Sequence, residues 1–118
     1  MVGYEIAFRA FPEFDLRVAD VAYVSARRWE ERDPEDNLRG TPDLVIEILS
    51  PSNTAREMYE KEQLCLSNGS REFWVIDPDK RTVRVAQSEG PTATYGLGEQ
   101  IPLRLFSGEL SVDEIFTT

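Results

Sequence analysis

Two acidic residues stand in apolar surroundings, where a charge is costly. Asp20 lies in the run VADVAYV and Glu47 in the run LVIEIL, each with apolar neighbours on both sides. A buried carboxylate is stable only when it is paired, hydrogen-bonded or bound to a cation. These two residues are therefore the first candidates for a chemical site, and each of them needs a partner.

The missing residue types restrict what such a site can do. The 118-residue sequence has no histidine, one cysteine and only two lysines, Lys61 and Lys80. The lack of histidine excludes Ser-His and Cys-His nucleophilic mechanisms together with most zinc sites. A site built from Asp, Glu and backbone oxygens favours a hard cation, so Mg²⁺ or Mn²⁺ is the metal that we expect.

Glu47 has two acidic candidates for a partner, and only one of them can share an ion with it. Asp43 lies on the same strand face, but four residues of strand place it about 13 Å away. Asp20 faces Glu47 if residues 16–24 pair antiparallel with residues 44–49 along their whole length. The two carboxylates would then lie about 5 Å apart and repel each other unless a proton or a metal ion lay between them. We therefore predict a metal site at Asp20 and Glu47.

Lys61 is the candidate for a positively charged side chain at this site. It stands on the helix stripe that should face the sheet, and its long stem could bring the ammonium beside Asp20 and Glu47. There it would orient a water molecule or neutralise a phosphate. Two alternative interpretations are a lysine that simply extends to solvent and an acidic pair that is neutralised by Arg17 or Arg56.

Periodicity and turn residues predict the elements that must position these side chains. Thr54 and Glu57 form a capping-box pattern before a helical run that Gly69 ends, which predicts a helix over residues 54–68. Residues 44–49 are apolar on both faces except at one position, as expected of a central strand covered on both sides. The further strands that we expect lie at residues 4–9, 16–24, 72–76 and 82–86, with turns at 11–13 and 77–80.

The remaining segments are less regular. Residues 25–41 mix both charge signs and should form a loop with a helical turn near residues 26–31. A second capping-box pattern, Ser111 with Glu114, predicts a short helix near the end of the chain. The aromatic side chains that we place in the core are Tyr4, Phe73 and Trp74.

Length and composition bound the class of protein. A chain with 118 residues, 41% of them apolar, fits one domain over residues 1–118 with a substantial core. Neither a secretory leader nor a membrane-spanning run is visible, and the lone Cys65 suits a reducing compartment, so we expect a cytoplasmic protein with no membrane partner. The net charge of −9 repels a polyanion, which disfavours DNA as a partner.

Three blocks of sequence resemble the Uma-type restriction endonucleases, a family within the PD-(D/E)XK nuclease superfamily. PDLVIEILSPS at residues 42–52 is similar to that family's central strand and turn, and EKEQLCLSNGSREFWVIDP at residues 60–78 is similar to its helix, glycine turn and Trp-bearing strand. RVADVAYVS resembles the preceding strand. The resemblance covers roughly residues 17–118, and this combination of blocks is more specific than one short motif.

The resemblance implies an α/β (α+β) restriction-endonuclease-like fold, which is a mixed sheet with a helix after the central strand. By position it assigns the superfamily's two acidic residues to Asp20 and Glu47 and its lysine to Lys61, displaced to the helix because Leu49 occupies the usual strand place. It also implies that the three residues are catalytic and that the two acids hold Mg²⁺ during hydrolysis of DNA phosphodiester bonds. Ala19 departs from the family pattern, which usually has proline before the first acid.

Family members usually carry several dozen more residues before this part, so we expect a domain that lacks the usual N-terminal part. Missing strands would leave an exposed sheet edge that a second copy could cover, which predicts a homodimer. Three functions stay open. They are a metal-dependent DNA endonuclease acting through Asp20, Glu47 and Lys61, a non-catalytic dimeric scaffold or binding module of the same fold, and a metal-dependent phosphohydrolase of a small substrate.

Overall fold

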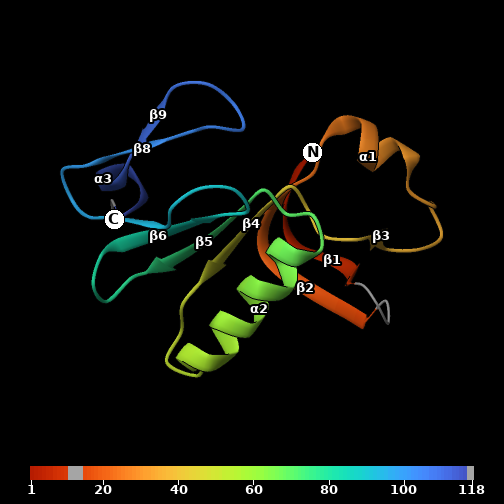
Figure 1. Ribbon diagram of the computed structural model, residues 1–118, viewed down its shortest axis with the longest axis horizontal. Helices are drawn as coiled ribbons and strands as arrows, with labels where there is room; N and C mark the ends of the chain where they lie inside the picture. The colour runs from red at the N-terminus through yellow and green to blue at the C-terminus, as the bar shows by residue number, and fades with distance from the viewer. Residues whose placement is uncertain (11–14, 117–118) are drawn as a thin grey trace.

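The computed structural model describes residues 1–10 and 15–116, which contain nine strands and three helices (Figure 1). The strands are β1 (Val2–Ala10), β2 (Asp15–Tyr23), β3 (Leu38–Arg39), β4 (Leu44–Ile48), β5 (Glu72–Asp77), β6 (Thr82–Gln87), β7 (Ala93–Tyr95), β8 (Gln100–Pro102) and β9 (Glu109–Ser111). The helices are α1 (Ala26–Glu31), α2 (Ala55–Ser67) and α3 (Val112–Ile115).

Seven of these strands form one mixed sheet in the order β3-β1-β2-β4-β5-β6-β7. Strands β4 and β5 run parallel with α2 as the crossover between them, whereas β4 pairs antiparallel with β2 on its other side. The predicted α+β fold, a mixed sheet with a helix directly after the central strand, is confirmed. The predicted strands at residues 72–76 and 82–86 correspond to β5 and β6, which pair antiparallel, and the predicted helical turn corresponds to α1, while β3, β7, β8 and β9 were not anticipated.

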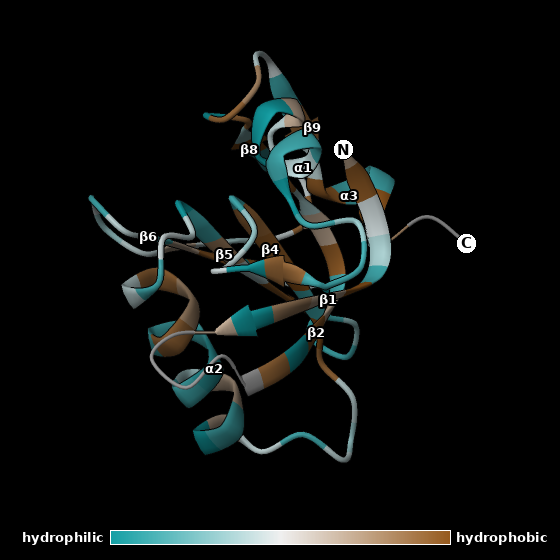
Figure 2. Cartoon of the chain, turned by 90° about the vertical axis from the view of Figure 1, so that its right-hand side faces the viewer, coloured by the Kyte–Doolittle hydropathy of each residue, from teal (hydrophilic) through white to brown (hydrophobic). Residues whose placement is uncertain are grey.

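Each face of the sheet carries its own apolar cluster. On one face α2 packs against the sheet, and Cys65 is completely buried there with Val45 and Phe73. On the other face the β8–β9 hairpin and α3 cover the sheet, with Trp74 and Ile101 in the cluster between them. Figure 2 shows α2 on one side of the sheet and β8 and β9 on the opposite side. Because alternate residues of a strand point to the same side, Glu47, two positions after Val45, also faces α2.

Helix α2 begins and ends where the sequence predicts. At its start the Thr54 hydroxyl accepts a hydrogen bond from the Glu57 N–H at 3.1 Å and donates one to the Glu57 carboxylate at 3.1 Å. At its other end Gly69 adopts a φ of 111°, a left-handed conformation that a residue with a Cβ rarely adopts. These two ends fix the register of the helix and therefore the place of Lys61 on it.

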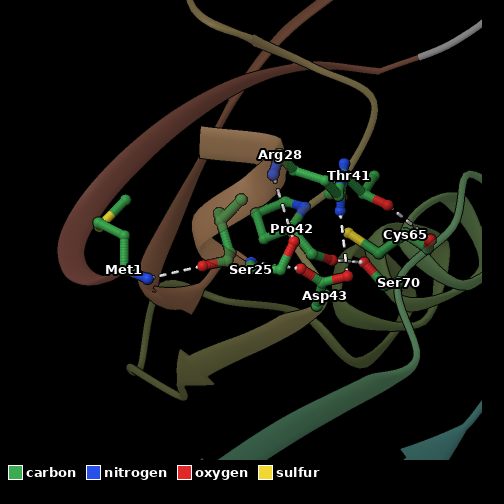
Figure 3. Close-up of polar contacts among 9 residues, drawn as sticks. Met1, Ser25, Arg28, Thr41, Pro42, Asp43, Cys65 and Ser70 are labelled. Carbon is green, nitrogen blue, oxygen red and sulfur yellow. Dashed lines mark hydrogen bonds and ion pairs between the residues drawn. The ribbon is translucent and has the colours of Figure 1, made fainter. Parts of the chain in front are cut away.

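Asp43, just before β4, anchors helix α1 (Figure 3). Its Oδ2 accepts from the Ser25 N–H at 2.8 Å and its Oδ1 from the Arg28 guanidinium at 3.2 Å. Arg28 also donates to the Thr41 carbonyl oxygen at 2.8 Å. Asp43 therefore has a structural role in tying the α1 segment to the sheet.

Two local predictions are wrong. Tyr4, expected in the core, is 80% exposed, because Glu5, with a positive φ of 49°, reverses the alternation of β1 between Tyr4 and the inward-facing Ile6. Ser111 does precede α3, but its side chain makes no capping hydrogen bond to that four-residue helix. The predicted turn at residues 11–13 lies outside the described residues. No helix in the described ranges has both the length and the apolar character needed to cross a membrane.

Candidate active site

The ladder between β2 and β4 stops where the two acidic residues meet. Its register is the predicted one, with the pairs Val21–Ile46, Ala22–Val45 and Tyr23–Leu44. The next pair in this register is Asp20 with Glu47. Pairing along the whole length of both strands, as predicted from the sequence, is wrong, because the Ile48 N–H donates to the Asp20 side chain and not to a backbone oxygen of β2.

The ladder on the other side of β2 is irregular at the same residue. Strands β1 and β2 pair from Val2 to Ala10, but this pairing omits Glu5 and Asp20, which stand opposite each other in its register. The positive φ of Glu5 is a conformation that residues with a side chain seldom adopt, and it marks a local irregularity of the strand. Asp20 is therefore outside the regular pairing on both sides of β2.

The two carboxylates bind backbone groups in this gap. The Asp20 N–H donates to Glu47 Oε2 at 3.1 Å, and the Ile48 N–H donates to Asp20 Oδ2 at 2.9 Å. Each acid thus binds the backbone of the strand that carries the other. The structure brings the two acids together at the open end of the β2–β4 pair.

Lys61 reaches the same point from α2. Its Nζ donates to the Val18 carbonyl oxygen of β2 at 2.6 Å and forms an ion pair with Glu47 Oε1. Apart from this ion pair, Glu47 Oε1 has no hydrogen-bond partner among the described residues. Arg56, which the alternative interpretation offered as a neutralising partner, pairs instead with Glu60 at 3.0 Å on the surface of α2.

Glu47 lies in an environment that disfavours its charge. The residue is only 3% exposed, whereas the Lys61 side chain is 27% exposed. Burial raises the pKa of Glu47, and the ion pair with Lys61 offsets this rise only in part; the hydrogen bond with the Asp20 carboxyl raises the pKa further. A raised pKa at a buried carboxylate is a common property of functional sites. A further positive charge beside Glu47 would stabilise its ionised form.

An open cleft of about 680 Å³ lies over these three residues. Its rim includes Arg17 of β2, Glu57 and Glu60 of α2, and Ser50 and Asn53 of the loop between β4 and α2. With the cluster included, the described lining therefore contains four carboxylates and two cationic side chains. The cleft as a whole attracts cations more than anions.

Sequence reasoning missed this polar rim. Glu57 was interpreted only as part of a helix cap, although its place four residues before Lys61 puts both on one side of the helix. The loop residue Ser50 lies in a turn, where its N–H donates to Asn53 Oδ1 at 2.9 Å. The same turn also forms part of the cleft wall. Helical spacing from Lys61 was the signal that could have identified Glu57.

The donor atoms fit a hard divalent cation in type. Asp20 and Glu47 offer carboxylate oxygens, and Mg²⁺ commonly binds one or two protein carboxylates while it keeps several waters. Glu47 Oε1 is a buried atom that is in contact with the Lys61 ammonium, so its position already suits a positive charge. Within the described ranges no group of three or more His, Cys, Asp or Glu side chains is arranged to hold a metal. Asp20 and Glu47 would therefore need water to complete the coordination of an ion.

A mixed sheet with a helical crossover after its central strand and an acidic cleft beside that helix is an arrangement typical of restriction-endonuclease-like proteins. The model of the Uma2 family, described as "Putative restriction endonuclease", matches residues 3–114, so the chain belongs to this family. The resemblance inferred from the sequence is thereby confirmed and extends to residue 3.

One solved structure supports the same fold. It is described as a "putative nuclease belonging to DUF820 from Anabaena variabilis ATCC 29413" and superposes with a TM-score of 0.81 at 24% sequence identity. The match covers 98% of this chain and 66% of that one, so the chain spans a little under two thirds of the length of its structural neighbour. No curated protein matches the sequence.

Proposed function

We propose that the chain is a metal-dependent endonuclease that hydrolyses DNA phosphodiester bonds at Asp20, Glu47 and Lys61. The observation that supports this most is the meeting of two strand-borne carboxylates and one helix-borne ammonium at a single cleft. Hydrolysis of a phosphodiester requires positive charge beside the phosphate and a positioned water, and these residue types can provide both. Membership of the Uma2 family agrees with this proposal.

Each residue has a distinct part in the proposed chemistry. Asp20 and Glu47 would hold Mg²⁺ or Mn²⁺, which supplies Lewis-acid stabilisation of the phosphate and a more acidic bound water. Lys61 favours the ionised form of Glu47 through its ion pair, while its bond to the Val18 carbonyl fixes the ammonium in place. An ammonium has three donors, so one donor of Lys61 can meet a water or a phosphate oxygen in the cleft.

A titration of the purified protein with Mg²⁺ and Mn²⁺ tests the metal site, with cleavage of single-stranded and double-stranded DNA measured in parallel. We expect wild type to bind the ion and to cleave DNA. Glu47→Gln keeps the shape and the acceptor oxygen but removes the charge. We expect it to lose more than 10²-fold in metal affinity and cleavage, beyond the roughly 10- to 100-fold effect of an outer residue.

Glu31→Gln is the matched control, because it removes the same charge from the surface of α1, where the side chain is 65% exposed. We expect this variant to bind metal and to cleave DNA as wild type does. Equal behaviour of Glu31→Gln and Glu47→Gln in both assays would contradict the assignment of the metal site.

A non-catalytic dimeric module of the same fold is the second candidate. The net charge of −9, which opposes binding of a polyanion, favours it. It predicts that the protein forms a dimer and cleaves no phosphodiester with either metal. Hydrolysis of bis(p-nitrophenyl) phosphate without cleavage of DNA would instead favour a phosphohydrolase of small substrates.

A further inference from the structure

The wall of the cleft that α2 forms is acidic. Glu57 and Glu60 line it, and the Glu60 side chain is 62% exposed beside its partner Arg56. A phosphate chain that enters the cleft is repelled by this wall. Favourable contacts with such a chain must therefore come mainly from the opposite wall, which β2 forms.

Lys61 lines the cleft and is held in place by two contacts. Its ammonium binds the Val18 carbonyl and the Glu47 carboxylate, which leaves one donor for a ligand. This donor lies beside the two acids and so can serve only the phosphate that reacts there. A second phosphate of the same polynucleotide chain needs another positively charged side chain.

Arg17 is the other positively charged residue among the described residues that line the cleft. It pairs with Phe8 across the β1–β2 ladder, and Phe8 belongs to the cluster on the α2 face, so the Arg17 side chain points to that face as well. The electrostatics agree with this placement. Burial raises the pKa of Cys65 to about 12, and the charges of Lys61 and Arg17 both oppose the rise.

We propose that Arg17 binds a phosphate flanking the one that reacts, so that the cleft accepts a polynucleotide strand in preference to a compound with a single phosphate. Three residues of strand place Arg17 about 10 Å from Asp20. One strand of DNA carries a phosphate for every ~3.4 Å of helix axis, so a DNA strand bound at Asp20 presents further phosphates near Arg17. The planar guanidinium matches two phosphate oxygens, which an ammonium cannot do.

This inference rests on the proposed function, but binding tests it without any turnover. The probe is a single-stranded phosphorothioate oligonucleotide in Mg²⁺, with affinity measured at several salt concentrations for wild type, Arg17→Ala and Arg17→Lys. We expect Arg17→Ala to weaken binding by about tenfold and to reduce the slope of log K against log salt by about one. Arg17→Lys should recover the slope but only part of the affinity, because it keeps the charge without the planar fork.

Arg27→Ala is the matched control for this series. Arg27 lies on α1 with its side chain 85% exposed, and it does not line the cleft, so the change removes one positive charge from elsewhere on the surface. We expect it to bind the probe as wild type does. Circular dichroism and thermal unfolding verify that Arg17→Ala, which changes an exposed residue, is folded.

Cleavage separates the two proposals. We expect Arg17→Ala to lose at least ten times more activity on an oligonucleotide than on bis(p-nitrophenyl) phosphate, which has no flanking phosphate. Equal losses on both substrates, or binding of the probe that is the same in Arg17→Ala and Arg27→Ala, would overturn the role of Arg17. If wild type hydrolyses neither substrate while binding still depends on Arg17, the proposed nuclease activity fails and the phosphate contact stands.

Discussion

Glu47 and Lys61 depend on each other, because one is almost fully buried and the other supplies its ion pair. Removal of one partner from a buried pair leaves the other charge uncompensated, which costs more than the pair contributes. The dependence is strongest for the carboxylate, since Lys61 can still reach solvent through its exposed fraction.

We expect Lys61→Met to lower the free energy of unfolding by roughly 2–3 kcal/mol in the absence of metal. The double variant Glu47→Gln with Lys61→Met should recover part of this loss, because it leaves no unpaired charge. Urea denaturation of the two single variants and the double variant measures the coupling. Strictly additive effects would show that the ion pair has no energetic role.

Cys65 should be a protonated and unreactive thiol in the folded protein. Burial raises its pKa to about 12 from an ordinary value of 9.0. A group with a raised pKa in the folded state contributes stability that is present below its unfolded pKa and is lost as the pH rises through the folded pKa. We expect the stability of wild type to fall relative to Cys65→Ala between pH 9 and pH 12, as measured by urea denaturation at several pH values.

Thiol labelling gives an independent measure of the same property. Iodoacetamide at pH 8 should modify Cys65 slowly in the folded protein and rapidly in guanidinium chloride, because the thiolate is the nucleophile and the sulfur is completely buried. Rapid labelling of the folded protein would contradict the burial of this thiol.

The two acids could be identified from their apolar neighbours alone, because a carboxylate in an apolar strand needs a partner whatever the fold is. Their register also followed from the sequence, since the two runs have matching anomalies. The break in both ladders at Asp20 could not be predicted. On the β1 side the break coincides with the positive φ of Glu5, which is an exposed residue with no unusual neighbours in the sequence.

At the level of elements, α2 carries the lysine and its caps determine where that lysine lies. Its N-cap was predictable because the Thr-x-x-Glu pattern has a local physical cause. The pattern at Ser111 is the same in sequence, yet its side chain makes no capping bond. Strands β7, β8 and β9 were missed because each has only three residues, too few for a periodic pattern.

We expect Thr54→Ala to lower the free energy of unfolding by about 1 kcal/mol, the typical effect of losing an N-cap side chain. Ser111→Ala is the matched control and should change stability by less than about 0.5 kcal/mol, since no hydrogen bond is lost. Thermal or chemical unfolding of both variants makes the comparison. A larger effect at Ser111 than at Thr54 would contradict the capping geometry.

For the molecule as a whole, the exposed apolar side chains of β1 and β2 favour contact with a second copy. Val2, Tyr4, Leu16 and Val18 are between 46% and 80% exposed on these two adjacent strands. The charge of −9 on each copy opposes their approach and is screened by salt. The predicted homodimer should therefore be stabilised as salt concentration rises.

Sedimentation equilibrium at 50 mM and 500 mM salt tests this prediction. We expect a tighter dimer at the higher salt concentration and a weaker one for Tyr4→Ser. Leu97→Ser is the matched control, because Leu97 is 53% exposed but lies beyond β7 on another part of the surface. A monomer at both salt concentrations would exclude the homodimer.

The carboxylates of Asp20 and Glu47 accept backbone hydrogen bonds in the seam where β2 and β4 separate. They connect the two strands by hydrogen bonds and are also the candidate metal ligands. Alanine at either position would therefore remove a hydrogen bond between the strands and a negative charge at the same time. Only the amide replacements, Asn for Asp20 and Gln for Glu47, keep an acceptor in the seam. Alanine scanning would therefore report damage to the fold as loss of chemistry at this site.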